Sequence, residues 1–215
     1  MIMDENSIWL MEQKIKRTIE SLEKNNMEGY YAKDEKEVLD IVKKLVNKGE
    51  SVSVGGSETL FQTGVIDFLR NGDFEFLDRY KPGLTRKEVV AIFKKSFLTD
   101  TYLVSSNAIT ENGELYNVDG NGNRVAAMLY GPDKVIVIVG KNKIVKNLDE
   151  AIQRNREYAA PANCKRLDRK TPCTKVGYCM DCKSEERICN EYTLIRRQGT
   201  KGRIKVIIVG KELGY

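Results

Sequence analysis

Apolar residues in the first part of the chain recur every three or four positions. Between residues 5 and 25, these positions are Ile8, Met11, Ile15, Ile19 and Leu22. The spacing places them along one face of a helix, and such a stripe most often packs against the body of a protein. An arm that docks a partner is the alternative. The pattern therefore predicts an N-terminal helical segment over residues 1–28, followed by a main domain over residues 29–215.

Beyond this segment, short apolar runs alternate with stretches of helical periodicity. Capping patterns predict the starts of two helices, at Asp34-x-x-Glu37 and Thr85-x-x-Glu88. In each, the Asp or Thr side chain can accept a hydrogen bond from a backbone N–H of the first turn, and the Glu three residues later can accept one from the N–H of the capping residue. Further helices are expected over residues 58–70, 124–130 and 147–160. Strands are expected over residues 51–55, 74–78, 101–105, 115–119 and 192–197, the third and fourth flanking a turn at residues 111–113.

Two further runs, residues 134–141 and 205–211, resemble each other and consist mainly of β-branched residues. Apolar and polar residues do not alternate in them, as is typical of strands that are covered on both faces. Strands that alternate with helices, together with doubly covered strands, indicate a parallel sheet. We therefore expect an α/β fold with a mostly parallel sheet and helices on both faces.

The composition excludes several classes of enzyme, because the 215 residues include no His. Ser-His-Asp and Cys-His hydrolases need an imidazole as base, and His-ligated zinc enzymes need it as a ligand. Any chemistry therefore has to rest on carboxylates, thiolates, Lys, Tyr, backbone amides or a cofactor. With 36 Lys and Arg against 31 Asp and Glu, the net charge of +5 suits an ordinary mixed surface, so no nucleic-acid partner is expected.

The hydropathy pattern gives no reason to place the chain in a membrane. Its longest aliphatic runs are far shorter than the roughly 20 residues that a membrane-spanning helix needs. The acidic start, Met-Ile-Met-Asp-Glu-Asn, has no long apolar core, so a secretory signal is not expected. The sequence thus predicts a soluble cytoplasmic protein without a membrane partner.

A glycine-rich turn follows the strand expected over residues 51–55. Glycines let a backbone approach a ligand, and free N–H groups at a helix start attract anions. The turn matches neither the Gly-x-Gly-x-x-Gly nor the Walker pattern, and a tight connection that needs glycine for its dihedral angles is the alternative reading. The ligand-binding candidates here are Gly55, Gly56, Ser57 and Glu58.

A second candidate loop system comprises residues 105–110 and 117–124. It ends at an apparent helix N-terminus, where backbone donors and a guanidinium could hold a carboxylate or phosphate together. Capped turns with a surface arginine are the alternative, because Asn, Asp and Gly are common in turns. The candidates are Asn107, Asp119, Asn123 and Arg124.

All five cysteines of the chain fall between residues 164 and 189. Only one Cys-x-x-Cys is present, so the paired pattern of structural zinc is incomplete, and irregular thiolate ligation fits an iron–sulfur cluster at least as well. Thiols without a metal are the third reading. Basic residues around the cysteines would lower thiol pKa values and offset an anionic centre. The metal-ligand candidates are Cys173, Cys179, Cys182 and Cys189, with Cys164 as a spare.

Several of these stretches together resemble the LUD domain, the lactate-utilisation family that includes the third protein of the bacterial L-lactate utilisation operon. The similar stretches lie at residues 105–124 and 131–140, and residues 155–164 and 171–189 resemble a cysteine-bearing branch of the family. The resemblance covers residues 11–210. Many members of the family are shorter and lack the cysteine segment.

The resemblance implies a fold like that of sugar-phosphate isomerases, glucosamine-phosphate deaminases and CoA-transferases. Those enzymes bind anionic substrates at strand-end glycine loops, which residues 55–57 and 121–124 match in position. Lactate-utilisation proteins act beside partners that carry iron–sulfur clusters, in a system that oxidises lactate to pyruvate. The family has no agreed catalytic residues, so none is transferred to this chain.

Three functions follow as hypotheses, and the sequence leaves open whether the protein is catalytic or accessory. The first is a LUD-domain protein of lactate or 2-hydroxy acid utilisation, with an iron–sulfur cluster for electron transfer and with iron–sulfur partner proteins. The second is a metal-free enzyme or binding domain for a small anionic ligand, with structural cysteines. The third is an assembly subunit whose N-terminal helix docks a partner. Self-association into a homo-oligomer is compatible with each of them.

Overall fold

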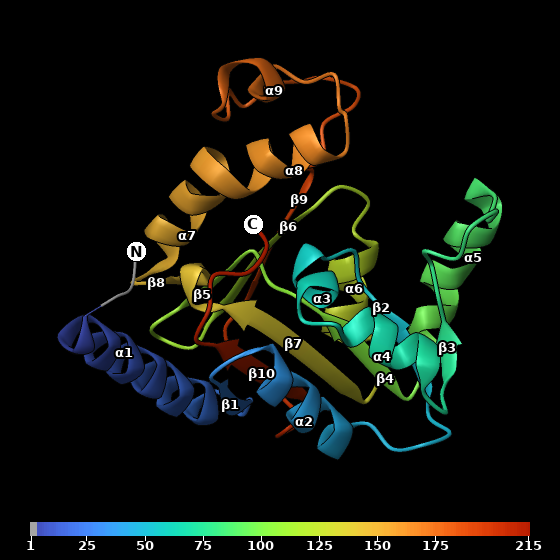
Figure 1. Ribbon diagram of the computed structural model, residues 1–215. Helices are drawn as coiled ribbons and strands as arrows, with labels where there is room; N and C mark the ends of the chain where they lie inside the picture. Colours follow the sequence, from blue (N-terminus) through green and yellow to red (C-terminus); the bar gives the residue numbers. More distant parts are fainter. Residues whose placement is uncertain (1–3) are drawn as a thin grey trace.

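The fold is built on a six-stranded sheet in which all strands run parallel. The computed structural model describes residues 4–215, so the first three residues of the predicted N-terminal segment lie outside the described residues. In order across the sheet, the strands are β1 (Glu28–Ala32), β10 (Ile204–Val209), β7 (Lys134–Gly140), β4 (Thr101–Val104), β2 (Ser51–Val54) and β3 (Glu75–Leu77) (Figure 1). The predicted parallel sheet is therefore confirmed.

The helices in the first part of the chain are α1 (Glu5–Lys24), α2 (Glu35–Leu45), α3 (Glu58–Gln62), α4 (Val65–Asn71), α5 (Arg86–Lys95) and α6 (Asn123–Tyr130). The predicted N-terminal helix is confirmed. The capping box of α5 is confirmed as well, since both reciprocal hydrogen bonds between Thr85 and Glu88 are present. The single helix predicted over residues 58–70 is wrong, because Gly64, with a φ of +71°, separates α3 from α4.

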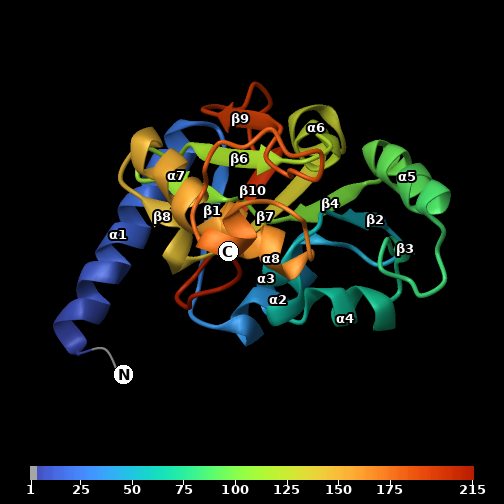
Figure 2. The ribbon, with the colours of Figure 1, turned by 90° about the horizontal axis from the view of Figure 1, so that it is seen from above.

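Apolar cores lie on both faces of the large sheet. Along β7, Val135, Val137 and Val139 enter the core on one face, and Ile136 and Ile138 enter the core on the other. The first core is closed by α1 and α6, and the second by α2, α3 and α4 (Figure 2). Consecutive side chains of a strand point to opposite faces, so a strand covered twice needs apolar residues throughout. This arrangement explains the unbroken apolar run of β7.

A smaller second sheet of four strands lies beside α6. Its order is β8 (Ile144–Val145), β5 (Ala108–Thr110), β6 (Leu115–Asp119) and β9 (Glu191–Ile195). The turn at residues 111–113 joins β5 to β6 in an antiparallel hairpin, whereas β4 belongs to the large sheet. The strands expected over residues 101–105 and 115–119 are therefore both present, but they lie in different sheets, and the strand directly before the turn, β5, was not predicted. The three residues of β5 are too few to show a strand pattern in the sequence.

The helix predicted over residues 147–160 is longer than expected. It comprises α7 (Leu148–Arg154), a π-helical turn (Asn155–Ala159) and α8 (Ala160–Arg166), with helical backbone angles at both junctions. The cysteine-rich excursion follows, including the short α9 (Cys173–Val176), and Figure 1 shows it above α8. No helix within residues 4–215 is long and apolar enough to cross a membrane.

Candidate functional site

A polar cavity of about 370 Å³ lies where β2, β4 and β7 end. Its walls come from the loop that follows each of these strands, from the N-terminal end of α6, and from α8. In an open parallel sheet, the loops at the carboxyl ends of the strands are the usual place for a ligand. We call this cavity the strand-end pocket.

The strand-end pocket brings together most of the residues that the sequence singled out in two separate loops. Those lining it are Gly56, Ser57, Glu58, Asn107, Asp119, Asn123 and Arg124. Gly55 lies behind the wall, where a Cβ atom would come within 2.7 Å of Val104 Cγ2. Its lack of a side chain therefore serves the close packing of β2 against β4. The binding role of the other residues stays a prediction.

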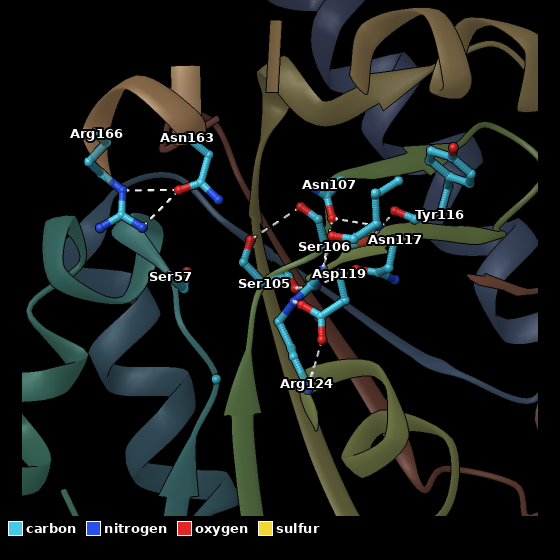
Figure 3. A network of polar contacts seen from close by, with 12 residues as sticks. Ser57, Ser105, Ser106, Asn107, Tyr116, Asn117, Asp119, Arg124, Asn163 and Arg166 are labelled. Atoms are coloured by element: carbon cyan, nitrogen blue, oxygen red, sulfur yellow. Dashed lines mark hydrogen bonds and ion pairs between the residues drawn. The ribbon is translucent and has the colours of Figure 1, made fainter. Parts of the chain in front are cut away.

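Arg124 holds the loops of the pocket together. The residue is 8% exposed, and its side chain forms an ion pair with Asp119 at 3.3 Å. All five guanidinium N–H groups donate to oxygen atoms of the protein, at distances of 2.6–3.3 Å; the acceptors are Asp119 Oδ1, Ser105 O, Asn117 Oδ1, Asn107 Oδ1 and Val118 O (Figure 3). In this arrangement all N–H groups of the Arg124 guanidinium are engaged within the protein, and its hydrogen bonds order the pocket wall.

On the other side of the pocket, α3 and α8 are connected by polar contacts. Ser57 caps α3, accepting a hydrogen bond from the N–H of Leu60 at 3.4 Å. Glu58 forms an ion pair with Arg166 of α8 at 3.1 Å. Arg166 also donates to Asn163 Oδ1, and Figure 3 shows this pair on α8 opposite the Arg124 cluster.

Lys143 is a pocket residue that the sequence reasoning missed. It ends the short turn after β7, is only 3% exposed, and donates from Nζ to Thr59 Oγ1 at 3.2 Å and to Ser105 Oγ at 3.0 Å. Burial, with the added repulsion of Arg154 and Arg124, holds the pKa of this amine well below its ordinary value. The one available signal was its position, two residues beyond a strand expected to be buried on both faces.

The charge of the strand-end pocket is strongly positive. Its only carboxylate side chains within the described residues are those of Glu58 and Asp119, and each is already paired with an arginine. The cationic side chains in the wall are Arg79, Arg86, Arg124, Lys143, Arg166 and Arg169. The described part of the chain gives no ion pair to four of these: Arg79, Arg86, Lys143 and Arg169. A cavity lined in this way attracts anions.

The five cysteines are free thiols spread along the excursion. Cys164 is buried at the end of α8, and burial raises its pKa to about 11. Hydrogen bonds from Ser184 lower the pKa of Cys182, whereas burial raises that of Cys189. Arg187 donates to the carbonyl of Cys189 at 2.7 Å.

The thiols do not form a metal site among the described residues. Within residues 4–215, no group of three or more Cys, Asp or Glu side chains is placed to hold a metal ion. The described geometry therefore offers no ligand set for a cluster. An iron–sulfur centre on Cys173, Cys179, Cys182 and Cys189 stays a prediction.

The fold and the pocket thus define an α/β protein with a cationic cavity at the ends of its parallel strands. The family model of the LUD domain matches residues 15–209, and the chain belongs to this family, as its sequence predicted. Among curated proteins, none matches the chain.

One solved structure agrees with this fold over nearly the whole chain. The crystal structure of a DUF162 family protein from Deinococcus radiodurans is similar at a TM-score of 0.50 and 16% identity, over 94% of this chain and 98% of that one. Weaker, partial similarities (TM-score 0.36) link the chain to eIF2B beta and eIF2B delta of Chaetomium thermophilum. They have 17% and 18% identity and cover 54% and 55% of this chain, and 44% and 50% of the other chains.

Proposed function

We propose that this LUD-domain protein binds a small organic carboxylate in the strand-end pocket and serves the utilisation of lactate or a related 2-hydroxy acid. The proposal rests on the cationic lining of the pocket, in which four of the six cationic side chains have no ion-pair partner among the described residues. Membership of the LUD family supports lactate as the metabolic context.

The pocket provides the groups that such a ligand requires. Arginine binds carboxylates through two parallel hydrogen bonds, and Arg79, Arg86 and Arg169 have no carboxylate partner in the described structure to compete with the ligand. The hydroxyls of Ser57 and Ser105 can donate to, or accept from, the hydroxyl or carbonyl group of a 2-hydroxy or 2-oxo acid. The site thus combines charge for affinity with hydroxyls for orientation.

Thermal shift and calorimetry with lactate and pyruvate test this proposal. A ligand present at 100 times its Kd should stabilise the protein by about 2.7 kcal/mol. Arg86→Gln and Arg169→Gln should weaken the binding, while Arg197→Gln, an exposed arginine outside the pocket, serves as the matched control. Binding that is absent, or that is unchanged in both pocket variants, would contradict the proposal. Glycerol 3-phosphate and CoA, tested in parallel, show whether phosphates are preferred.

A second candidate function rests on the cysteine segment. Arg187 contacts two of the five cysteines, since its guanidinium is 3.7 Å from Cys189 Sγ and also donates to the carbonyl of Cys182. We propose that residues 164–189 rearrange to bind an iron–sulfur cluster that passes electrons to iron–sulfur partner proteins during oxidation of the 2-hydroxy acid. Loading the cluster would also order the segment, because metal binding is coupled to folding.

Anaerobic purification followed by iron and sulfide analysis tests this second function. Stoichiometric iron and a visible absorption band are expected, and both should disappear in Cys182→Ala. Cys164→Ala is the matched control, since this cysteine is the predicted spare. An iron-free protein with five titratable thiols would eliminate the redox function and leave the carboxylate pocket unaffected.

A further inference from the structure

Lys143 combines three features that the binding of an anion does not require. Its side chain is buried in the pocket wall, its Nζ contacts only the hydroxyls of Thr59 and Ser105, and no carboxylate pairs with it among the described residues. A buried ammonium without a counterion is costly, so such a lysine is retained most readily as a neutral amine. A neutral amine is a nucleophile.

The surroundings of the amine favour the neutral form from every side. Arg124 lies on α6 and Arg154 on α7, and both repel a positive charge on Nζ. The remaining close groups are uncharged: the hydroxyls of Thr59 and Ser105, and the backbone of Gly214, where a Cβ atom would lie 3.4 Å from Nζ. The two carboxylate side chains of the pocket, Asp119 and Glu58, are engaged by Arg124 and Arg166.

We propose that Lys143 forms a covalent imine with a 2-oxo acid bound in the strand-end pocket. The inference rests on the proposed binding of carboxylates, which holds the acid group at the arginines of the wall and leaves the neighbouring carbonyl carbon for the amine. A 2-hydroxy acid has no electrophilic carbon at this position, so only the oxidised partner of the pair reacts. The pocket would thereby distinguish the product of 2-hydroxy acid oxidation from its substrate.

The reaction is a condensation without change of oxidation state. The nitrogen lone pair forms a C–N bond to the carbonyl carbon, and the carbonyl π electrons move to oxygen, which takes up a proton while nitrogen loses one. The resulting carbinolamine then loses its hydroxyl group together with the second N–H proton as water, which leaves the C=N bond. The hydroxyls of Ser105 and Thr59, which contact Nζ and lie 3.4 Å from each other, can relay these protons.

Reductive trapping tests the proposal on the full chain. The protein is incubated with pyruvate and sodium cyanoborohydride, and intact mass and peptide mapping locate the adduct. One pyruvate-derived group on Lys143 is expected, with complete loss in Lys143→Met and no change in Lys146→Arg, an exposed lysine nearby. Lactate in place of pyruvate should give no adduct, and excess lactate should suppress the pyruvate adduct by competing for the pocket.

The outcomes separate this inference from the function on which it rests. Binding of pyruvate by calorimetry without an adduct on Lys143, or with adducts only on surface lysines, would overturn the imine and leave carboxylate binding intact. An absence of binding to any carboxylate would overturn both. Mapping the adduct on the wild-type protein keeps the test decisive even where Lys143→Met does not fold.

Discussion

Replacing Arg124 should destabilise the protein more than any exposed charge would. In Arg124→Ala, five oxygen acceptors in the pocket wall each lose one hydrogen bond, and the carboxylate of Asp119, whose side chain is 14% exposed, loses its ion-pair partner. Removing one partner of a buried pair costs about 3–5 kcal/mol, because the other charge stays buried and unpaired. We therefore expect the free energy of unfolding to fall by about 3–5 kcal/mol.

Urea unfolding followed by far-UV circular dichroism measures this loss. Arg124→Lys keeps the charge but cannot reach five acceptors from one nitrogen, so it should restore only the smaller part of the lost stability. Arg17→Ala is the control, since it breaks an exposed pair with Glu111 at 3.3 Å and should cost about 0–1 kcal/mol. If Arg124→Ala were no more destabilising than Arg17→Ala, the guanidinium would not be the support of the pocket wall.

Three further substitutions test separate features. The pKa of Lys143 is lowered in the folded chain and has its ordinary value of 10.5 in the unfolded chain. Between these two values the unfolded chain binds more protons than the folded chain, so the free energy of unfolding rises with pH. Urea unfolding should therefore show wild type gaining on Lys143→Met as the pH rises toward 10.5, and a constant difference would contradict the buried neutral amine. Gly55→Ala places a Cβ atom 2.7 Å from Val104 and should cost about 1–3 kcal/mol, against little for Gly199→Ala, where no atom lies within 4 Å; equal melting temperatures would refute this. Thr85→Ala removes the cap of α5 and should cost about 1 kcal/mol in the same melts, and no change would mean that the cap is dispensable.

The large sheet was predictable because the residue pattern of its central strands itself indicates that both faces are covered. β7 is buried from Val135 to Gly140. Its run of Val and Ile would expose apolar side chains if one face of the strand were open to solvent. The edge strand β1 is different, since most of its residues are only partly buried and show neither a run nor an alternation. The second sheet was not predicted from the sequence, for another reason. β6 pairs with β9 across more than 70 residues of chain, and no local pattern encodes such a pairing.

In the pocket, too, some residues could be found from the local sequence, whereas the role of Lys143 depends on residues that are distant in the sequence. Ser57 was found because it follows a strand of the parallel sheet in a glycine-rich loop, at the edge where ligands usually bind. Asp119 was found because it ends a strand, β6, in a stretch rich in Asn, Asp and Gly. Lys143 also follows a strand, but its meaning depends on what surrounds it. Thr59, Ser105 and Arg154 come from three other parts of the chain, and together they surround this lysine without a counterion. Lys134 and Lys205, by contrast, are partly buried but each has a carboxylate partner. Sequence position can therefore nominate a pocket residue, whereas the chemistry of that residue follows from the charges that folding brings around it.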